Sequence, residues 1–320
     1  MTMHRRSLFA ATALGAIAAP GLALGAAATE QAPGFYRFKV GQRTVTVVHD
    51  GFAHVPDILH GFVRNAPAEA VEASLRESFM LPPGLDIVFT ITFVETTAGL
   101  VVFDTGTGNQ LGSPHAGTIA ANMRAAGIDP AAVTRVVISH FHGDHITGLT
   151  TPEDAPIFPN AALWVPDPEY AYWMDDGVMS RAPAGMQGAF RNVRRRLAPY
   201  AARMERYAAG AEVAPGLRAV ATHGHTPGHM SFTLADGNDS LMILSDVTNH
   251  SELNLKNPGW HLVFDMDPVL AEATRRRVFD QVATDRLRCI GYHFPFPANG
   301  HVVKTAGGYR FIPAIWTAAI

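Results

Sequence analysis

The sequence predicts a single mixed α/β domain in which two β-sheets pack face to face, with helices on their outer sides. Three observations support this fold class. Predicted strands and helices alternate along two similar halves of the chain, and no Gly/Ser-rich linker separates the halves. Finally, histidine or aspartate follows directly after several predicted strands, and the ends of such strands meet at one edge of a sheet.

The first half of the chain predicts two strand pairs followed by a helix and a central strand. Its expected strands are residues 35–40, 43–48, 87–96, 100–103 and 136–138, and its expected helices are residues 67–78 and 118–126. Residues 52–65 predict a loop that forms part of a pocket wall. Asp104 ends one strand, and we expect it either to support a metal shell or to fix the turn.

The second half repeats this order after an insertion that is rich in helix-forming residues. A strand is expected at residues 161–165, and the insertion contains the helices expected at residues 169–174 and 188–207. The expected strands of the second half are residues 217–221, 230–235, 240–244 and 287–291, and its expected helix is residues 268–284. The apolar stripe of residues 188–207 indicates core contact. We nevertheless select Trp173 and Phe190, which lie in the insertion, as candidates for the apolar wall of a substrate pocket.

A dense group of metal-binding side chains follows the central strand of the first half. The group consists of His140, His142, Asp144 and His145. The first two histidines are two residues apart in an extended segment, so both imidazoles project to the same side. Gly143 then turns the chain and can direct the next two donors to a second ion. Four ligands in so short a stretch indicate two metals, whereas the alternative is a polar surface turn.

Further candidates follow strands of the second half. His225 and His229 lie in a tight turn that contains two glycines and Pro227, so the turn can present one or two imidazoles inward. Asp246 and His293 each follow a short apolar strand. The repeated occurrence of histidine or aspartate directly after a predicted strand is stronger evidence for a metal site than any single motif.

Composition excludes several classes of protein. The chain has 320 residues with 48% hydrophobic and 17% charged residues, and its net charge of −3 argues against nucleic acid as a partner. The arginine triplets at 194–196 and 275–277 predict solvated helix faces. Cys289 is the single cysteine and lies in an apolar run, which predicts a buried side chain and excludes a cysteine-rich zinc site.

The first 28 residues predict an export signal of the twin-arginine type. Arg5 and Arg6 precede an apolar Ala/Leu/Gly stretch, and alanines at 26–28 form a small-residue cleavage pattern. The alternative to an export signal is a membrane anchor, but the apolar stretch is short for that role. We therefore expect a mature domain of residues 29–320 in the periplasm or outside the cell, without stable membrane insertion.

The order of these motifs resembles the metallo-β-lactamase superfamily over about residues 36–300. This resemblance implies an αββα four-layer sandwich. It also implies that His140, His142 and His225 hold one metal, that Asp144, His145 and His293 hold the other, and that Asp246 bridges the two. His229 matches the turn of the family pattern, but in the family it supports the shell and is not a direct ligand.

Asp246 distinguishes branches of the family, since true β-lactamases generally carry cysteine or serine there. The leader, the run around His293 and the aromatic residues of the insertion most resemble methyl parathion hydrolase and its lactonase and arylesterase relatives. The implied activity is a binuclear metal hydrolase in which a hydroxide shared by both ions attacks a lactone, an aryl ester or an organophosphate triester. Asp144 and Asp246 would be both ligands and catalytic residues.

The resemblance implies two divalent ions, with zinc as the default for nitrogen and oxygen ligands and manganese, iron or cobalt as alternatives. We select His250 and Asn249 as candidates for the general acid, against a role as ordinary loop residues. The expected partner is a small-molecule substrate, and a homodimer is compatible with the sequence. The competing functions are a β-lactamase-like amide hydrolase, a redox enzyme on the same fold and a non-catalytic metal-binding protein.

Overall fold

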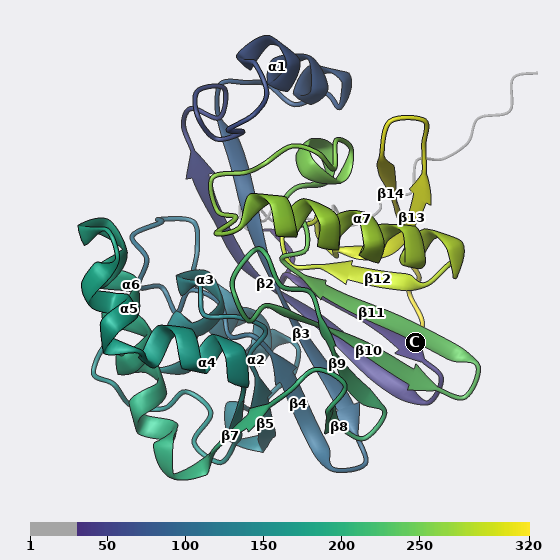
Figure 1. The fold of residues 1–320 in the computed structure, drawn as a ribbon. Helices are drawn as coiled ribbons and strands as arrows, with labels where there is room; N and C mark the ends of the chain where they lie inside the picture. Colours follow the sequence, from purple (N-terminus) through teal and green to yellow (C-terminus); the bar gives the residue numbers. More distant parts are fainter. Residues whose placement is uncertain (1–30) are drawn as a thin grey trace, which may run out of the picture. The chain divides into compact units, whose positions relative to one another are not determined.

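Two seven-stranded sheets form the centre of the fold in the computed structural model, which describes residues 31–320. Residues 33–320 make up one compact unit (Figure 1). The expected export signal, residues 1–28, lies outside the described residues. Within residues 31–320, no helix combines the length and the apolar character needed to cross a membrane.

Each sheet contains strands that are neighbours in the sequence. The first sheet has the order β1(Phe35–Val40), β2(Arg43–Val55), β3(Leu85–Thr96), β4(Gly99–Phe103), β5(Val133–Val137), β6(Ala162–Pro166) and β7(Met204–Tyr207). The second sheet has the order β14(Tyr309–Pro313), β13(Asn299–Lys304), β12(Arg288–Gly291), β11(Asp239–Ser245), β10(Met230–Asp236), β9(Leu217–Ala221) and β8(Glu212–Ala214).

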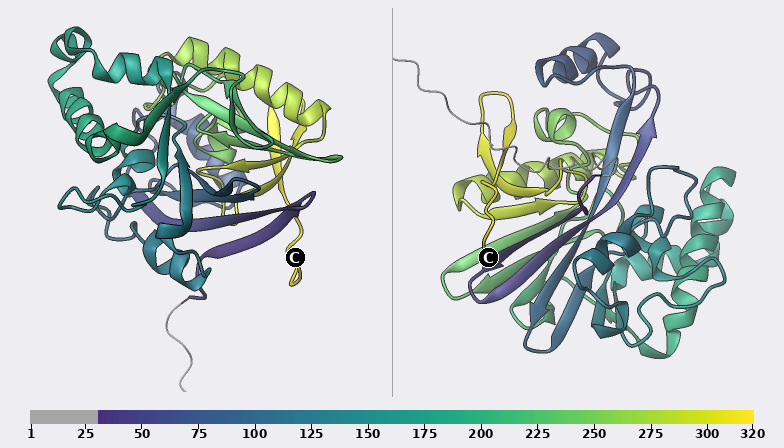
Figure 2. Two further views of the ribbon diagram at one scale, coloured as in Figure 1. Left: turned by 90° about the horizontal axis from the view of Figure 1, so that it is seen from below. Right: turned by 180° about the vertical axis from the view of Figure 1, so that it is seen from behind.

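Helices cover the outer faces of both sheets and complete the expected αββα sandwich (Figures 1 and 2). The helices are α1(Ala68–Glu77), α2(Ile119–Ala125), α3(Gly143–Ile146), α4(Asp167–Met174), α5(Asp176–Arg181), α6(Ala184–Leu197) and α7(Pro268–Thr284). Side chains of α2, α4 and α6 pack into one hydrophobic core with the first sheet, whereas α7 packs into a second core that also fills the space between the sheets.

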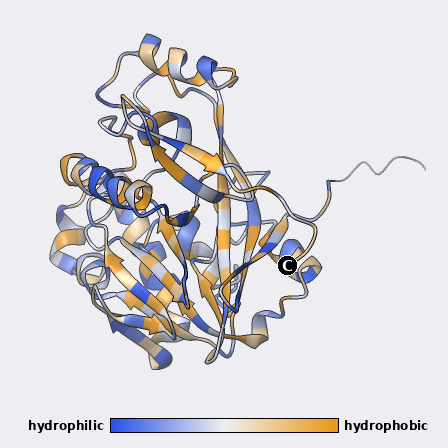
Figure 3. Ribbon diagram, turned by 90° about the vertical axis from the view of Figure 1, so that its right-hand side faces the viewer, coloured by the Kyte–Doolittle hydropathy of each residue, from blue (hydrophilic) through white to orange (hydrophobic). Residues whose placement is uncertain are grey.

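The strands are apolar on both faces because both faces are buried. Val101 and Phe103 belong to the core between the sheets, whereas Val102 belongs to the core under the helices. This division follows from the alternation of side chains along a strand. In Figure 3 the strands accordingly carry hydrophobic residues along much of their length, whereas the helices mix hydrophobic with hydrophilic ones.

Two elements depart from the sequence prediction. The expected loop at 52–65 begins as strand, since β2 continues to Val55 and pairs with β3 as far as Leu85. The expected helix at 188–207 ends at Leu197 and continues as a 3₁₀ segment and then as β7. Pro199 lacks the N–H that the α-helix would need at this point.

Candidate metal centre

Strand ends from both sheets bring the predicted metal ligands to one edge of the sandwich. In the first sheet β4 and β5 run parallel, so their carboxyl ends lie together. In the second sheet β11 and β12 are also parallel, with Asp246 directly after β11 and His293 shortly after β12. His225 enters from the β9–β10 loop, residues 222–229. All seven predicted ligands therefore meet, and none is left elsewhere in the fold.

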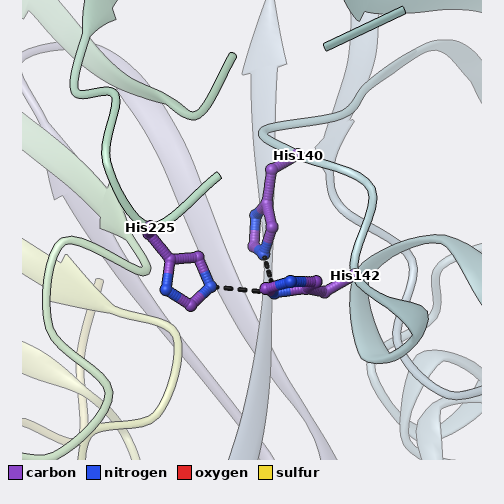
Figure 4. Close-up of side chains that lie close together, drawn as sticks. All are labelled: His140, His142 and His225. Atoms are coloured by element: carbon purple, nitrogen blue, oxygen red, sulfur yellow. Dashed lines mark hydrogen bonds between the residues drawn. The ribbon is translucent and has the colours of Figure 1, made fainter. Parts of the chain in front are cut away.

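His140, His142 and His225 form the three-histidine cluster (Figure 4). His140 Nε2 lies 3.1 Å from His142 Nδ1, and His142 Nδ1 lies 2.9 Å from His225 Nε2. His140 and His142 come from the loop after β5, residues 138–142, whereas His225 comes from the opposite sheet. The three nitrogens point toward one another, as the ligands of a common ion do.

Asp144, His145 and His293 form the second cluster, and Asp246 lies between the two clusters. Asp246 Oδ2 lies 3.4 Å from His225 Nε2 and 3.0 Å from His293 Nε2. Asp246 Oδ1 lies 3.3 Å from His145 Nε2. Ser245 precedes this aspartate with a left-handed φ of 49°, a strained backbone conformation for a non-glycine residue that is often found at functional sites. A bridging position for Asp246 matches this geometry.

The charge states of His140, His142 and Asp246 suit metal binding. Burial, reinforced by neighbouring histidines, lowers the pKa of His140 and of His142 well below the usual value, so both imidazoles are neutral. Burial alone would raise the pKa of Asp246, but His293 and His145 lower it well below its usual value. Neutral imidazole and ionised carboxylate are the forms that bind divalent ions. Burial alone would lower the pKa of His145 and of His293, but Asp246 and neighbouring carboxylates raise it, so metal binding at the second cluster would release protons from these rings.

The donor set fits two divalent ions. His145 Nε2 and Asp246 Oδ1 are buried and form no hydrogen bond, although buried polar atoms normally have partners. Within each cluster the ligand atoms lie no more than 4.8 Å apart. Tetrahedral zinc with Zn–N bonds of about 2.0–2.1 Å separates its ligand nitrogens by about 3.3 Å, close to the spacing of the three histidines.

Outer partners hold the other nitrogen of four candidate ligand histidines, which are His140, His145, His225 and His293. Asp104 Oδ2 lies 2.9 Å from His145 Nδ1 and also accepts a bond from the Ser139 hydroxyl. Asp104 therefore has the supporting role that we considered for it, and its other oxygen accepts the Ser139 N–H and holds the start of the loop after β5. Asp265 Oδ1 lies 3.0 Å from His225 Nδ1. Such partners fix the orientation of a ligand ring.

Asp265 in turn accepts a hydrogen bond of 2.8 Å from Arg275, which is completely buried. Arg275 belongs to one of the arginine triplets that we expected on solvated helix faces, and Arg196 of the other triplet is also buried. Both predictions of solvation are wrong for these two residues, because each guanidinium finds buried oxygen acceptors. The sequence offered no motif that marked Asp265 or Arg275.

His229 supports the shell, as the resemblance implies, and belongs to neither cluster. Its Nε2 accepts a hydrogen bond of 2.9 Å from the backbone N–H of Asp246. Its Nδ1 lies 2.8 Å from the hydroxyl of Thr222. Burial lowers the pKa of His229 to about 3, so the ring stays neutral and keeps its acceptor nitrogen. His229 therefore fixes the backbone of the bridging aspartate.

A cavity of about 310 Å³ opens onto both clusters. Its polar lining consists of His142, Asp144, His225, Asp246, Asn249 and His293. Its apolar lining comes from β2 and β3, with Ala53, Val55, Ile87 and Phe89, and from Leu111 and Phe264 outside them. The expectation that residues 52–65 contribute to a pocket wall is therefore confirmed for the part that forms strand.

The prediction that Trp173 and Phe190 line the substrate pocket is wrong. Their rings pack against each other with centroids 4.7 Å apart, and both side chains are almost fully buried in the core under the first sheet. Neither contributes to the cavity beside the metal ligands. Helices α4 and α6 pack against each other, so these aromatic residues fill the space between the two helices.

His250 does not line the cavity either, although its neighbour Asn249 does. His250 is buried at the start of a π-helical turn, residues 251–255, where its Nδ1 accepts the Glu252 N–H at 3.1 Å. Burial lowers the pKa of His250 to about 4, so the ring is neutral near pH 7 and lacks the acidic imidazolium proton that a general acid donates. The geometry places His250 in a capping role and contradicts its selection as a general acid.

Comparison with known proteins identifies the class. A family model described as the Metallo-beta-lactamase superfamily matches residues 90–293, which is more than half of the chain. The chain therefore belongs to the metallo-β-lactamase superfamily. No curated protein matches it.

Several solved structures share the fold. Hydrolase AbOPH of the β-lactamase superfamily is 26% identical, with a TM-score of 0.84 over 90% of this chain and 100% of that one. The dizinc quorum-quenching lactonase AidC is 23% identical, with a TM-score of 0.83 over 89% of this chain and 98% of that one. A probable metal-dependent hydrolase from Staphylococcus aureus is 17% identical, with a TM-score of 0.70 over 87% of this chain and 100% of that one.

Proposed function

We propose that this chain is a binuclear metal-dependent hydrolase that opens lactones or cleaves aryl esters or organophosphate triesters. The observation that carries the proposal is the position of Asp246, whose two oxygens face ligands of both clusters at the floor of an apolar cavity. Two divalent ions held there, zinc by default, would lower the pKa of a water toward neutrality and polarise the carbonyl or phosphoryl oxygen of the substrate.

The two aspartates contribute differently. The side chain of Asp246 is 3% exposed and receives a hydrogen bond from Asn249 Nδ2, so it holds a fixed position between the clusters. The side chain of Asp144 is 22% exposed and lines the cavity, so its carboxylate lies where substrate and water have access. We propose Asp246 as the bridging ligand and Asp144 as the ligand that faces the substrate.

The cavity favours substrates whose leaving group departs without a strong general acid. Among the described residues that line it, the only polar side chain outside the ligand set is Asn249, and an amide does not donate a proton as an acid. A phenol or an activated alcohol leaves readily as the anion, and a lactone alkoxide remains tethered to the product. This observation supports esters, lactones and phosphotriesters over amides.

The apolar wall favours uncharged substrates with aryl or acyl groups. Val55, Ile87 and Phe89 project from the long strands β2 and β3 into the cavity. No lysine or arginine lines the cavity among residues 31–320, so it lacks the cations that phosphodiesters and nucleic acids need. The dizinc lactonase AidC, which shares the fold, was solved with a product bound, and this supports a small-molecule substrate here.

The proposal is tested by a rate panel on purified protein of measured metal content. The panel consists of an aryl ester, dihydrocoumarin, a long-chain acyl-homoserine lactone, methyl parathion and the cephalosporin nitrocefin, each with and without chelator. We expect turnover of lactone, aryl ester or phosphotriester that a chelator abolishes and added zinc or manganese restores.

Two results would contradict the proposal. Turnover of nitrocefin alone would indicate a β-lactamase-like amide hydrolase. Absence of turnover on every substrate, with two ions bound, would favour a redox enzyme or a metal-binding protein without catalysis.

A further inference from the structure

A buried carboxylate outside the ligand set joins the two loops that carry the three-histidine cluster. Glu169 lies in the first turn of α4 and is completely buried. Its Oε1 accepts hydrogen bonds from the Phe141 N–H at 3.0 Å and the Trp173 indole N–H at 2.8 Å. Its Oε2 accepts bonds from the Thr226 hydroxyl at 2.9 Å and the Gly228 N–H at 2.7 Å.

The donors stand directly beside the ligands of one cluster. Phe141 lies between His140 and His142 in the loop after β5, and Thr226 follows His225 in the β9–β10 loop. These loops belong to different sheets. One side chain therefore fixes the backbone of both loops relative to each other, and with it the spacing of the three imidazoles.

Close packing leaves the β9–β10 loop little freedom to take another position. A Cβ atom at Gly228 would lie only 2.2 Å from the backbone nitrogen of Glu169, so the loop is pressed against the start of α4. None of the hydrogen bonds of Glu169 reaches Asp144, His145, Asp246 or His293. The influence of Glu169 is thus directed to one of the two clusters.

We propose that Glu169 is a positioning residue that sets the metal affinity of the three-histidine cluster and leaves that of the second cluster nearly unchanged. The inference rests on the metal binding that the proposed function requires. An ionised carboxylate offers lone pairs to all four donors, whereas a glutamine of the same shape would turn its NH₂ group toward two of them. At least one backbone N–H would then be left without an acceptor in the interior.

The test compares the stepwise zinc affinities of the full chain and its Glu169→Gln variant in competition with a chromophoric chelator. The His225→Ala variant identifies which binding step belongs to the three-histidine cluster. In Glu169→Gln we expect this step to weaken on the order of 10- to 100-fold, as outer-shell changes do, and the other step to stay within about threefold.

Two further variants separate the hydrogen bonds from the charge. Thr226→Val keeps the carboxylate and removes one of its donors, so it should weaken the same step by a smaller factor. Glu272→Gln neutralises a carboxylate on α7 that bonds His261 and Arg276, and it should leave both steps unchanged.

The proposal is overturned if folded Glu169→Gln binds zinc with both steps unchanged, or with both weakened equally. Should Glu169→Gln fail to fold by circular dichroism, Thr226→Val decides: a weakened His225-dependent step supports the proposal, and an unchanged step overturns it. No substrate enters the assay. A negative result for Glu169 can therefore be distinguished from a failure of the proposed hydrolase activity, because only the rate panel measures that activity.

Discussion

Asp246 is the residue on which the proposed two-ion arrangement depends most. Replacing it with alanine removes the carboxylate that faces His145, His225 and His293. We expect kcat/KM to fall by more than the 10- to 100-fold typical of outer-shell changes, and metal content to fall below two ions per chain. Kinetics and elemental analysis of the folded variant check this, with the exposed Asp285→Ala as control.

Full two-ion occupancy with unchanged turnover in Asp246→Ala would show that the bridging assignment is wrong. In the control Asp285→Ala we expect full occupancy and unchanged turnover, because this side chain follows α7 and takes no part in either cluster.

His250 should make the folded state sensitive to acid. Folded His250 binds a proton only below about pH 4, whereas an unfolded histidine does so below about 6.5. Protonation therefore favours the unfolded chain, and stability contributed by neutral His250 is present above pH 6.5 and lost as the pH falls toward 4. The shift corresponds to roughly 3 kcal/mol over this window.

His250→Asn should remove this part of the pH dependence and keep the cap, because the asparagine side chain can also accept the Glu252 N–H. Urea unfolding at pH 7 and at pH 4.5 measures the difference. If the free energy of unfolding falls by the same amount from pH 7 to pH 4.5 in both proteins, His250 does not contribute to the pH dependence of stability.

At this scale the sequence predicts well which side chains meet in the two clusters and predicts poorly which side chains support them. The candidate ligands lie within a few residues after predicted strands, so their metal-binding pattern can be recognised in the sequence alone. Asp265 and Glu169 reach the ligands only through the folded chain, across long separations in sequence, and carry no local pattern. The prediction that Trp173 and Phe190 line the pocket was wrong because the apolar character of these residues does not reveal which neighbours they contact.

At the scale of elements, the long strands β2 and β3 determine the apolar side of the cavity. Val55 pairs with Leu85, and Ala53 pairs with Ile87, near the ends of these strands. We expect Val55→Ser to raise KM for a long-acyl substrate by about tenfold, the effect of losing apolar contact in a pocket, and to change kcat little.

Comparison of a long-acyl with a small lactone checks this prediction, because the small substrate should be almost unaffected. Val303→Ser on β13 is the matched control, since that valine is partly exposed and lies outside the cavity. Equal losses on both substrates would mean that Val55 affects the metal centre and not the acyl group.

Most elements could be predicted because strands and helices differ in their apolar period. The boundaries of β1, β4 and α7 match the expected ones closely. The helix at 188–207 was predicted too long because its stripe continues through Pro199 into β7, which is placed by parallel pairing with β6. The hairpin of β13 and β14 was not predicted, and its place is set by pairing with β12.

At the scale of the whole molecule, we propose that the first 28 residues direct export by the twin-arginine route. Replacing Arg5 and Arg6 with lysine should keep the protein in the cytoplasm, because this route depends on the arginine pair. Fractionation of a bacterial host, followed by immunoblotting, checks this. The same distribution for both proteins would contradict the export signal.

The family, the fold and the two clusters agree on one site, and we propose that its central feature is a pair of ions that share Asp246. Anomalous diffraction from crystals of the metal-loaded protein measures this directly. We predict two peaks about 3.5–4 Å apart, each about 2.0–2.2 Å from an oxygen of Asp246. A single peak, or two peaks with the Asp246 carboxylate bound to only one of them, would contradict the binuclear site.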